Sequence, residues 1–370
     1  MRGEVNKQAA IMLAVTPDQL VPQDHPIRRI KPLVDQALAE LSPVFESIYA
    51  RIGRPSIPPE HLLKAQLLMA LYSVPSARRF CDQLQYNMLF KWFLDLNLDD
   101  RPFNASSFSK NQERLLSADV ARRFLLQIVE LARQRRLLSE EHFSVDGTLL
   151  ESWASLKSLR PLDRDGDEPP SAAGGSGGKD PEVDYRGEKR SNASHRSTTD
   201  PEARLARKPF SQAKLCYLGH ALMDNRHGLV VDIELTQAAG VTEWQTALVM
   251  LERSVRRRHQ ATLGADRNYD NRGFVAGCRE RGVTPHVVQY PTTPRRRSAI
   301  DGRTTRHPGY GLSLRLRKRI EEVFGWWKTV AGGRKLRYLG VQRNRAFAEL
   351  CAATYNLLRI ANIEAASRPA

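Results

Sequence analysis

Apolar side chains recur every three or four residues through most of the first 140 residues, the spacing that buries one face of an α-helix. The clearest stripe follows two prolines and consists of Leu62, Leu63, Leu67 and Leu71. Prolines are tolerated there because amides in the first turn of a helix have no intrahelical acceptor. Similar patterns predict helices over about 76–86, 107–115 and 118–134. We therefore expect residues 1–140 to form an all-helical N-terminal domain.

The hydrophobic pattern changes to a period of two at His142. Phe143 and Val145 alternate with polar neighbours, which predicts a strand over 142–148. Further strands are expected at 217–223, at 228–235, up to 265–266 and at 285–290. After the strand at 228–235, helical patterns near 244–251 and 274–281 alternate with the later strands. Two more helical patterns follow, near 314–330 and 346–361. Three early strands followed by alternating helices and strands predict a mixed α/β sheet with helices on both faces, over residues 141–364.

One segment inside this α/β region has a different composition. Between 161 and 209 the only large apolar residues are Leu162, Val183, Tyr185 and Leu205, and five residues at 174–178 are Gly or Ser. Such a stretch buries too little surface to offset the entropy lost on ordering. We expect a flexible insertion at about 161–209.

Overall composition excludes several classes of protein. Hydrophobic residues make up 41% of the 370 and charged residues 26%, so the chain can bury a core and is neither disordered nor a membrane protein. No secretory signal is evident at the start, which predicts a cytoplasmic, nucleoid-associated location. The cysteines lack metal-ligand or disulfide spacing and are expected to be reduced and buried: Cys81, Cys216, Cys278 and Cys351.

Charge changes this picture, because the chain carries a net +16 and has a pI near 10.0. Fifteen Lys and Arg stand against three acids between 291 and 345. This concentration favours a phosphate-binding groove over a solvated surface and predicts a nucleic-acid partner. In the N-terminal region, Arg78, Arg79 and Lys110 suit a DNA-reading helical domain, although ordinary surface cations would give the same pattern.

Two aspartates stand in or at the end of predicted strands. Asp146 lies in the first strand and precedes Gly147, and Asp266 closes the strand that precedes Arg267. Ligand sites in α/β sheets gather at strand ends, so both are candidates for one site. Either aspartate could instead form a turn or cap a helix.

A third acid lies on the predicted helix at 314–330. The apolar stripe of this helix should face the sheet, and Arg317, Glu321 and Lys328 lie together beside it. Taken alone, this group is also an ordinary pattern for a helix surface. Three acids from two strands and a helix are, however, the set that two-metal phosphoryl transfer requires, because hard Mg²⁺ or Mn²⁺ ions take oxygen ligands.

In these stretches the chain resembles the DDE transposases of bacterial insertion sequences, in the IS-five-like group. The first and second Asp stand in Phe143-Ser144-Val145-Asp146-Gly147-Thr148 and in Gly264-Ala265-Asp266-Arg267-Asn268-Tyr269. The run from Arg317 through Glu321 to Lys328 fits the Arg-x3-Glu-x6-Lys pattern of the family. One position departs from the pattern, since Leu314 replaces the tyrosine expected three residues before the Arg. Glu322 adjoins Glu321, and the spacing to Lys328 favours Glu321.

The resemblance implies a ribonuclease-H-like catalytic core behind a helical domain that binds terminal-repeat DNA. It implies that Asp146, Asp266 and Glu321 hold two Mg²⁺ (or Mn²⁺) ions and catalyse cleavage of the element's ends. The freed 3′-hydroxyl would then join to target DNA. DNA would be held by cations, namely Arg317, Lys328, Arg319, Arg78, Arg79 and Lys110. A homodimer is expected because two DNA ends must be paired.

Two other functions fit the same residues. A domesticated relative would bind DNA without cutting it, but the intact set of acids counts against decay. A nuclease on the same core would cut without joining strands. No Gly-x4-Gly-Lys-Ser/Thr motif occurs, so no nucleotide cofactor is expected, and no membrane partner is expected either.

Overall fold

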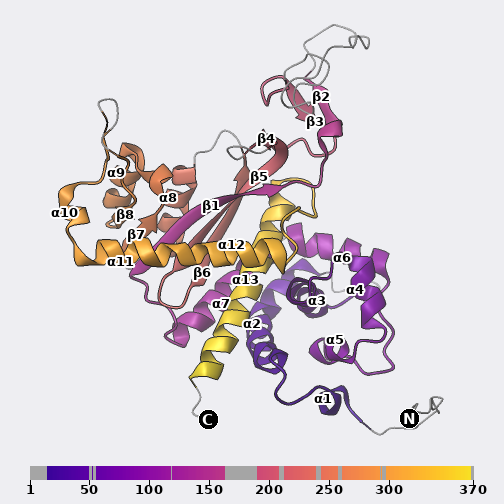
Figure 1. Ribbon diagram of the computed structural model, residues 1–370. Helices are drawn as coiled ribbons and strands as arrows, with labels where there is room; N and C mark the ends of the chain where they lie inside the picture. Colours follow the sequence, from indigo (N-terminus) through magenta and orange to yellow (C-terminus); the bar gives the residue numbers. More distant parts are fainter. Residues whose placement is uncertain are drawn as a thin grey trace, which may run out of the picture.

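The computed structural model describes residues 15–49, 52, 56–117, 119–162, 190–207, 212–238, 243–256, 261–291, 293 and 297–367. Figure 1 shows an N-terminal group of helices packed beside a mixed sheet. The long helix α13 passes between the two.

The first seven helices confirm the helical character of the N-terminal region. Their bounds are α1 (Pro17–Leu20), α2 (Ile27–Ile48), α3 (Pro59–Leu71), α4 (Ala77–Leu84), α5 (Met88–Phe93), α6 (Ala105–Ser117) and α7 (Val120–Gln134). Side chains cap two of the short helices at their starts, since Ser76 accepts from the amide of Arg79 and Asn87 accepts from that of Phe90. Helix α3 is buried on nearly all sides, which explains its continuous apolar sequence.

The central sheet is mixed, as predicted. Its strands are β1 (His142–Glu151), β4 (Arg204–Ala206), β5 (Lys214–Asp224), β6 (Leu229–Gln237), β7 (Thr262–Ala265) and β8 (Thr284–Val287). Apart from β4, which also pairs with β5, the strands follow the order β6-β5-β1-β7-β8. Strand β5 is antiparallel to β1 and β6, whereas β1, β7 and β8 are parallel. This order and these directions are the ribonuclease-H-like arrangement, which confirms the expected fold class.

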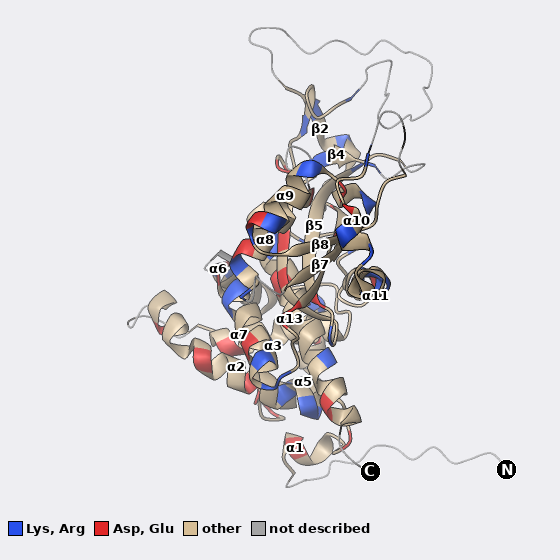
Figure 2. Ribbon diagram, turned by 90° about the vertical axis from the view of Figure 1, so that its left-hand side faces the viewer, with Lys and Arg blue, Asp and Glu red and all other residues tan. Residues whose placement is uncertain are grey.

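Helices cover both faces of this sheet. Figure 2 shows the strands between α8 and α9 on one side and α10 and α11 on the other. The bounds are α8 (Glu243–Ser254), α9 (Arg272–Glu280), α10 (Gly302–Thr305), α11 (Pro308–Leu316), α12 (Ile320–Thr329) and α13 (Val341–Ala366). Helix α12 runs beside β1, and α13 packs on both β6 and α7.

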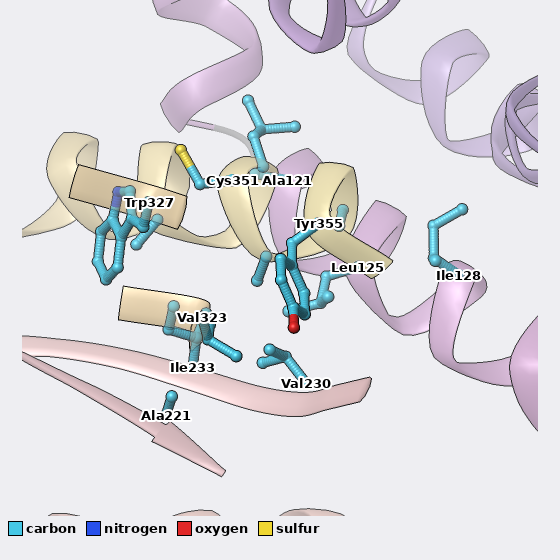
Figure 3. Packing of buried hydrophobic residues seen from close by; sticks show 14 of the residues in the cluster. Ala121, Leu125, Ile128, Ala221, Val230, Ile233, Val323, Trp327, Cys351 and Tyr355 are labelled. Carbon is cyan, nitrogen blue, oxygen red and sulfur yellow. The ribbon is translucent and has the colours of Figure 1, made fainter. Parts of the chain in front are cut away.

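One hydrophobic core joins the sheet and the helices. Figure 3 shows Val323 and Trp327 of α12 above Ala221 and Ile233 of the sheet, with Tyr355 of α13 beside them. Trp327 is 1% exposed. A Cβ on Gly219 would lie 3.2 Å from the Trp327 ring, so glycine at this position of β5 allows α12 to lie close to the sheet.

Several element bounds differ from the sequence prediction, two of them near the acids and the insertion. The helix expected at 314–330 begins at Pro308, where the His307 side chain accepts from the amide of Gly309, and Arg317–Arg319 form a 3-10 turn before α12. Within 161–209, expected to be a flexible insertion, β2 (Leu159–Pro161) pairs with β3 (His195–Ser197), and β4 pairs with β5. Strands β3 and β4 lie within 161–209, and each pairs with a strand outside that segment or at its edge. This pairing stabilises them. The rest of that insertion, 163–189 and 208–209, lies outside the described residues.

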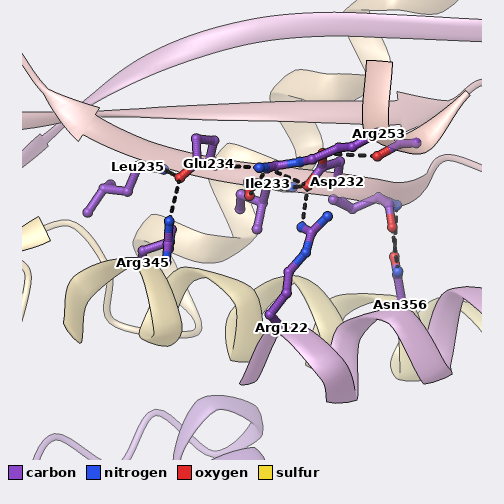
Figure 4. A network of polar contacts seen from close by, with 10 residues as sticks. Arg122, Asp232, Ile233, Glu234, Leu235, Arg253, Arg345 and Asn356 are labelled. Atoms are coloured by element: carbon purple, nitrogen blue, oxygen red, sulfur yellow. Dashed lines mark hydrogen bonds and ion pairs between the residues drawn. The ribbon is translucent and has the colours of Figure 1, made fainter. Parts of the chain in front are cut away.

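A buried polar network connects the helical region to the sheet (Figure 4). Asp232 of β6 is 0% exposed and accepts from Arg253 of α8, with Nε at 2.5 Å, and from Ser254 at 2.9 Å. Arg122 of α7 also pairs with Asp232. Asn356 of α13 bonds both backbone groups of Val230, at 2.8 and 2.7 Å. These contacts fix α7, α8 and α13 against β6.

Two further expectations can be compared with the structure. All four cysteines are buried and free of disulfides. Among the described residues, every helix is too short or too polar to cross a bilayer.

Candidate active site

The two predicted aspartates lie side by side where two parallel strands part. Strand β1 pairs with β7 up to Ser144 and Gly264. Asp146 and Asp266 each stand two residues beyond this last pair, Asp146 still within β1 and Asp266 just after β7. The structure therefore brings together two residues that are far apart in the sequence.

Asp146 lies in a partly buried position that disfavours its charge. Its Oδ1 accepts from the amide of Gly147 at 2.8 Å. Burial is the main cause that raises the pKa of Asp146 to about 6; the nearby charges of Asp266 and Glu321 contribute to this rise, whereas the Gly147 amide and Arg317 oppose it. Asp266 and Glu321 are therefore near enough to Asp146 for their charges to act on its carboxyl group.

Asp266 also has the local role that a strand-end aspartate commonly takes. Its Oδ1 accepts from the amide of Asn268 at 2.8 Å and caps the 3-10 turn Arg267–Tyr269. This bond holds the side chain at the end of β7 while its second oxygen makes no ion pair with a described residue. Asp266 can therefore cap this turn with one oxygen and still be a candidate site residue through the other.

Glu321 lies in the first turn of α12, exposed at the edge of the buried stripe. Its neighbour Glu322 pairs with Arg359 at 3.7 Å, on α13. Lys328, two turns later, donates to the hydroxyl of Thr148, which shares a face of β1 with Asp146 because side chains alternate along a strand. The predicted group of Arg317, Glu321 and Lys328 therefore lies along the Asp146 face of β1.

The tyrosine nearest to Leu314, where the family pattern expects one, has a different role. Tyr310 donates to the carbonyl oxygen of Val287 at 2.7 Å, which ties α11 to β8.

The two arginines predicted to bind DNA near Glu321 make different contacts. Arg319 donates to the carbonyl oxygen of Asn225 at 3.3 Å. Arg317 packs over Gly264, and its Nε is buried without a hydrogen-bond partner among the described residues.

Sequence reasoning missed a fourth acid, Glu243, at the start of α8. Burial, with a contribution from the charges of Asp146 and Asp266, raises the pKa of Glu243 to about 7. Its carboxylate lies against Gly147, because a Cβ built on that glycine would be 2.3 Å from Glu243 Oε1. Only the packing of α8 against β1 reveals this proximity; in the sequence, Glu243 resembles any acid that favours the positive end of a helix dipole.

The chemistry of these side chains fits a divalent cation, but their present positions do not enclose one. Carboxylate oxygens are the ligands that Mg²⁺ and Mn²⁺ prefer. In the described part of the chain none of these four acids makes an ion pair, although the charge of Arg317 acts on Asp146. No three Asp, Glu, His or Cys side chains of that part are arranged to hold a metal ion. Side-chain rotation toward one another would be needed on ion binding.

A cationic pocket of about 360 Å³ opens beyond the acids along β1 and β5. Its charged lining consists of Glu151, Arg207, Lys214, Lys328 and Arg334. Glu151 pairs with Lys214 at 2.8 Å, and the other cations leave the pocket positive.

The predicted N-terminal cations Arg78, Arg79 and Lys110 are exposed on α4 and α6, which Figure 1 places away from β7.

Two transposase families match this chain. The transposase domain DUF772 matches residues 15–114, and the transposase DDE domain matches residues 196–357. Together the two matches cover more than half of the chain. The second contains Asp266 and Glu321, while Asp146 precedes it.

The chain also has distant likenesses to solved structures. A piggyBac transposase synaptic complex with hairpin DNA is 10% identical with a TM-score of 0.41, and the match covers 93% of this chain and 77% of that one. A pre-cleavage Mos1 transpososome is 11% identical with a TM-score of 0.22, covering 85% and 82%. A Mos1 paired-end complex with Mg is 11% identical with a TM-score of 0.21, covering 89% and 87%. These scores are too low to carry an argument. The curated proteins contain no match.

Proposed function

Since this chain belongs to the DDE transposases of insertion sequences, we propose that it cuts the ends of its own element and joins the freed 3′-hydroxyl to target DNA. The observation that supports the proposal is that Asp146 and Asp266 stand just beyond the last β1–β7 pair, with Glu321 near enough for its charge to act on Asp146. These three acids are the proposed catalytic residues.

The residues around the acids support phosphoryl transfer. Asp146 and Asp266 stand at the parting of β1 and β7, and Glu321 approaches from α12. Two Mg²⁺ or Mn²⁺ ions held by these carboxylates would activate the attacking hydroxyl and stabilise the departing oxygen.

Cations beside the acids would bind the DNA backbone. Lys328 lies between the acids and the cationic pocket, and Arg317 adjoins Asp146. With Arg319 they place positive charge along α12 and the turn before it, and Figure 2 shows further Lys and Arg on α10 and α11. Such charges hold phosphates without joining the chemistry.

The remaining partners belong to the same proposal. The exposed Arg78, Arg79 and Lys110 would contact the terminal inverted repeats of the element. Two copies of the chain would pair the two ends as a homodimer. The proposed reaction needs no nucleotide cofactor.

The test uses DNA that carries the inverted repeats flanking the gene, with a second plasmid as target. Wild-type protein in Mg²⁺ should nick the ends and give joined products, and chelation by EDTA should stop both steps. Cleavage without joined products would indicate a nuclease. Sequence-specific binding without cleavage would indicate an inactive DNA-binding relative, and either result would overturn the proposal.

A further inference from the structure

We propose that Glu243 is a fourth carboxylate of the active site and that the hydroxyl of Tyr269 orients the group bound there. This inference rests on the proposed function, because it concerns the divalent cation that the three acids would hold. It adds an acid from α8, on the face of β1 opposite to α12.

Close packing places Glu243 at the site. Gly147 follows Asp146 directly, and a Cβ at Gly147 would lie 2.3 Å from Glu243 Oε1 and 3.0 Å from its Cδ. The carboxylate therefore occupies the space that a side chain at 147 would fill. Since Asp146 and Gly147 are adjacent, Glu243 reaches the same end of the β1–β7 pairing from the other face.

The charge of Glu243 has no structural use in the described part of the chain. Other acids of this region serve the fold: Asp232 is enclosed by Arg122 and Arg253, and Glu252 of the same helix pairs with Arg281 at 3.0 Å. Glu243 has no such ion pair there. A half-buried carboxylate beside two other acids is costly unless a cation neutralises it.

Tyr269 gives an independent indication of a ligand. It follows Asp266 by three residues, is 1% exposed, and its hydroxyl is buried with no hydrogen-bond partner among the described residues. Its ring packs edge-on against Phe274, which fixes the side chain. The hydroxyl is near enough to Glu243, Asp146 and Asp266 for their charges to act on it. Buried hydroxyls normally have partners, and a bound group or its water would supply one here.

Glu243 would then supply an oxygen ligand together with Asp146 and Asp266. The Tyr269 hydroxyl would donate to Glu243 or to a bound water and hold it in the ligating orientation. Hydrogen bonds of this kind commonly change metal affinity about 10–100-fold when they are removed.

The experiment measures Mn²⁺ binding to the full-length protein by calorimetry, without DNA. Glu243→Gln should weaken Mn²⁺ binding about tenfold or more, and Tyr269→Phe should weaken it to a smaller extent. Glu252→Gln, on the same helix with the same change of charge, should bind as wild type. Thermal unfolding without Mn²⁺ should show no loss of stability in Glu243→Gln, because the change removes repulsion between acids.

Asp146→Asn separates this inference from the function on which it rests. If Asp146→Asn weakens binding and Glu243→Gln does not, Glu243 is structural and the inference fails while the proposed function stands. If neither variant affects binding, the metal site itself is misplaced and both fail.

Gly147→Ala supplies a second route if Glu243→Gln fails to fold. The added methyl must displace the Glu243 carboxylate while all four charges remain. Gly147→Ala should therefore weaken Mn²⁺ binding, and should add little in a Glu243→Gln background. Equal effects of Gly147→Ala in both backgrounds would contradict the inference.

Discussion

At the scale of single residues, the site depends on charges that the fold leaves uncompensated. Burial and neighbouring acids raise the pKa of Asp146 to about 6, whereas Asp232, which is fully buried, is enclosed by two arginines. Under the proposed function, this difference separates a catalytic acid from a structural one. Whether an acid pairs with a cation, more than how exposed it is, therefore indicates which acids could take part in catalysis.

Lys328 gives a prediction at this scale. Lys328→Ala removes one cation from the pocket beside the acids, so DNA binding should weaken and the slope of log affinity against log salt should fall by about 1. Thr148→Val is the control, because it removes the hydrogen bond to Lys328 and keeps the charge. Fluorescence anisotropy across a salt series measures both. An unchanged slope in Lys328→Ala would show that this lysine does not contact phosphate.

Asp146, Asp266 and Glu321 could be selected from the sequence, whereas Glu243 could not. The first three stand in recognisable local patterns of strand end and helix face. Glu243 comes near the proposed site only because α8 packs on β1, about a hundred residues earlier in the chain. The missing side chain at Gly147 is the single local signal, and it is a weak one because Asp-Gly pairs are common in turns that have no catalytic role.

At the scale of elements, hydrophobic periodicity predicted the features that depend only on residues close together in the sequence. The buried stripe of α12 was predicted correctly, with Ile320, Val323, Phe324 and Trp327 all buried. The start of the helical run at Pro308 was missed, because it depends on the cap from His307. Strand β4 was missed because three residues of low hydrophobicity become a strand only when β5 offers them a partner.

Helix α13 allows a test of pH dependence. Burial raises the pKa of Glu349 to about 8, while Arg122 and Arg345 oppose the rise. The folded state therefore holds a proton that the unfolded state releases near pH 4.5, so stability falls as pH rises from about 4.5 to about 8.

Glu349→Gln should abolish this part of the pH dependence and should raise stability at pH 9 by on the order of 3 kcal/mol. At pH 5 the variant and the wild type should differ little. Urea unfolding at the two pH values measures the effect. A variant that is destabilised at pH 9 would show that Glu349 is charged and paired in the folded protein.

At the scale of the whole molecule, the helical region and the sheet form one packed body. Residues from α2, α3, α6 and α7 share a continuous core with α13 and the strands. The division at residue 140 remains a prediction about function, since α13 contacts both parts. This packing holds the proposed DNA-reading helices in a fixed position relative to the acids.

The Asp232 network tests this coupling. Asp232→Ala leaves Arg122 and Arg253 without their buried partner and should lower the free energy of unfolding by about 3–5 kcal/mol. Arg345→Ala, which removes a more exposed pair at 3.6 Å, should cost about 1 kcal/mol or less. Chemical denaturation followed by tryptophan fluorescence compares them. Equal costs would show that Asp232 does not hold α7 and α8 to β6.

The central claim, that three acids from β1, the end of β7 and α12 form one catalytic site, is tested most directly by Mg²⁺-dependent nicking of the element's ends. Asp146→Asn, Asp266→Asn and Glu321→Gln should each reduce the nicking rate about a thousandfold or more while DNA binding persists. Glu322→Gln, adjacent to Glu321 and paired with Arg359, should nick at nearly the wild-type rate. Wild-type nicking by any one of the three site variants, or loss of nicking in Glu322→Gln alone, would contradict the account.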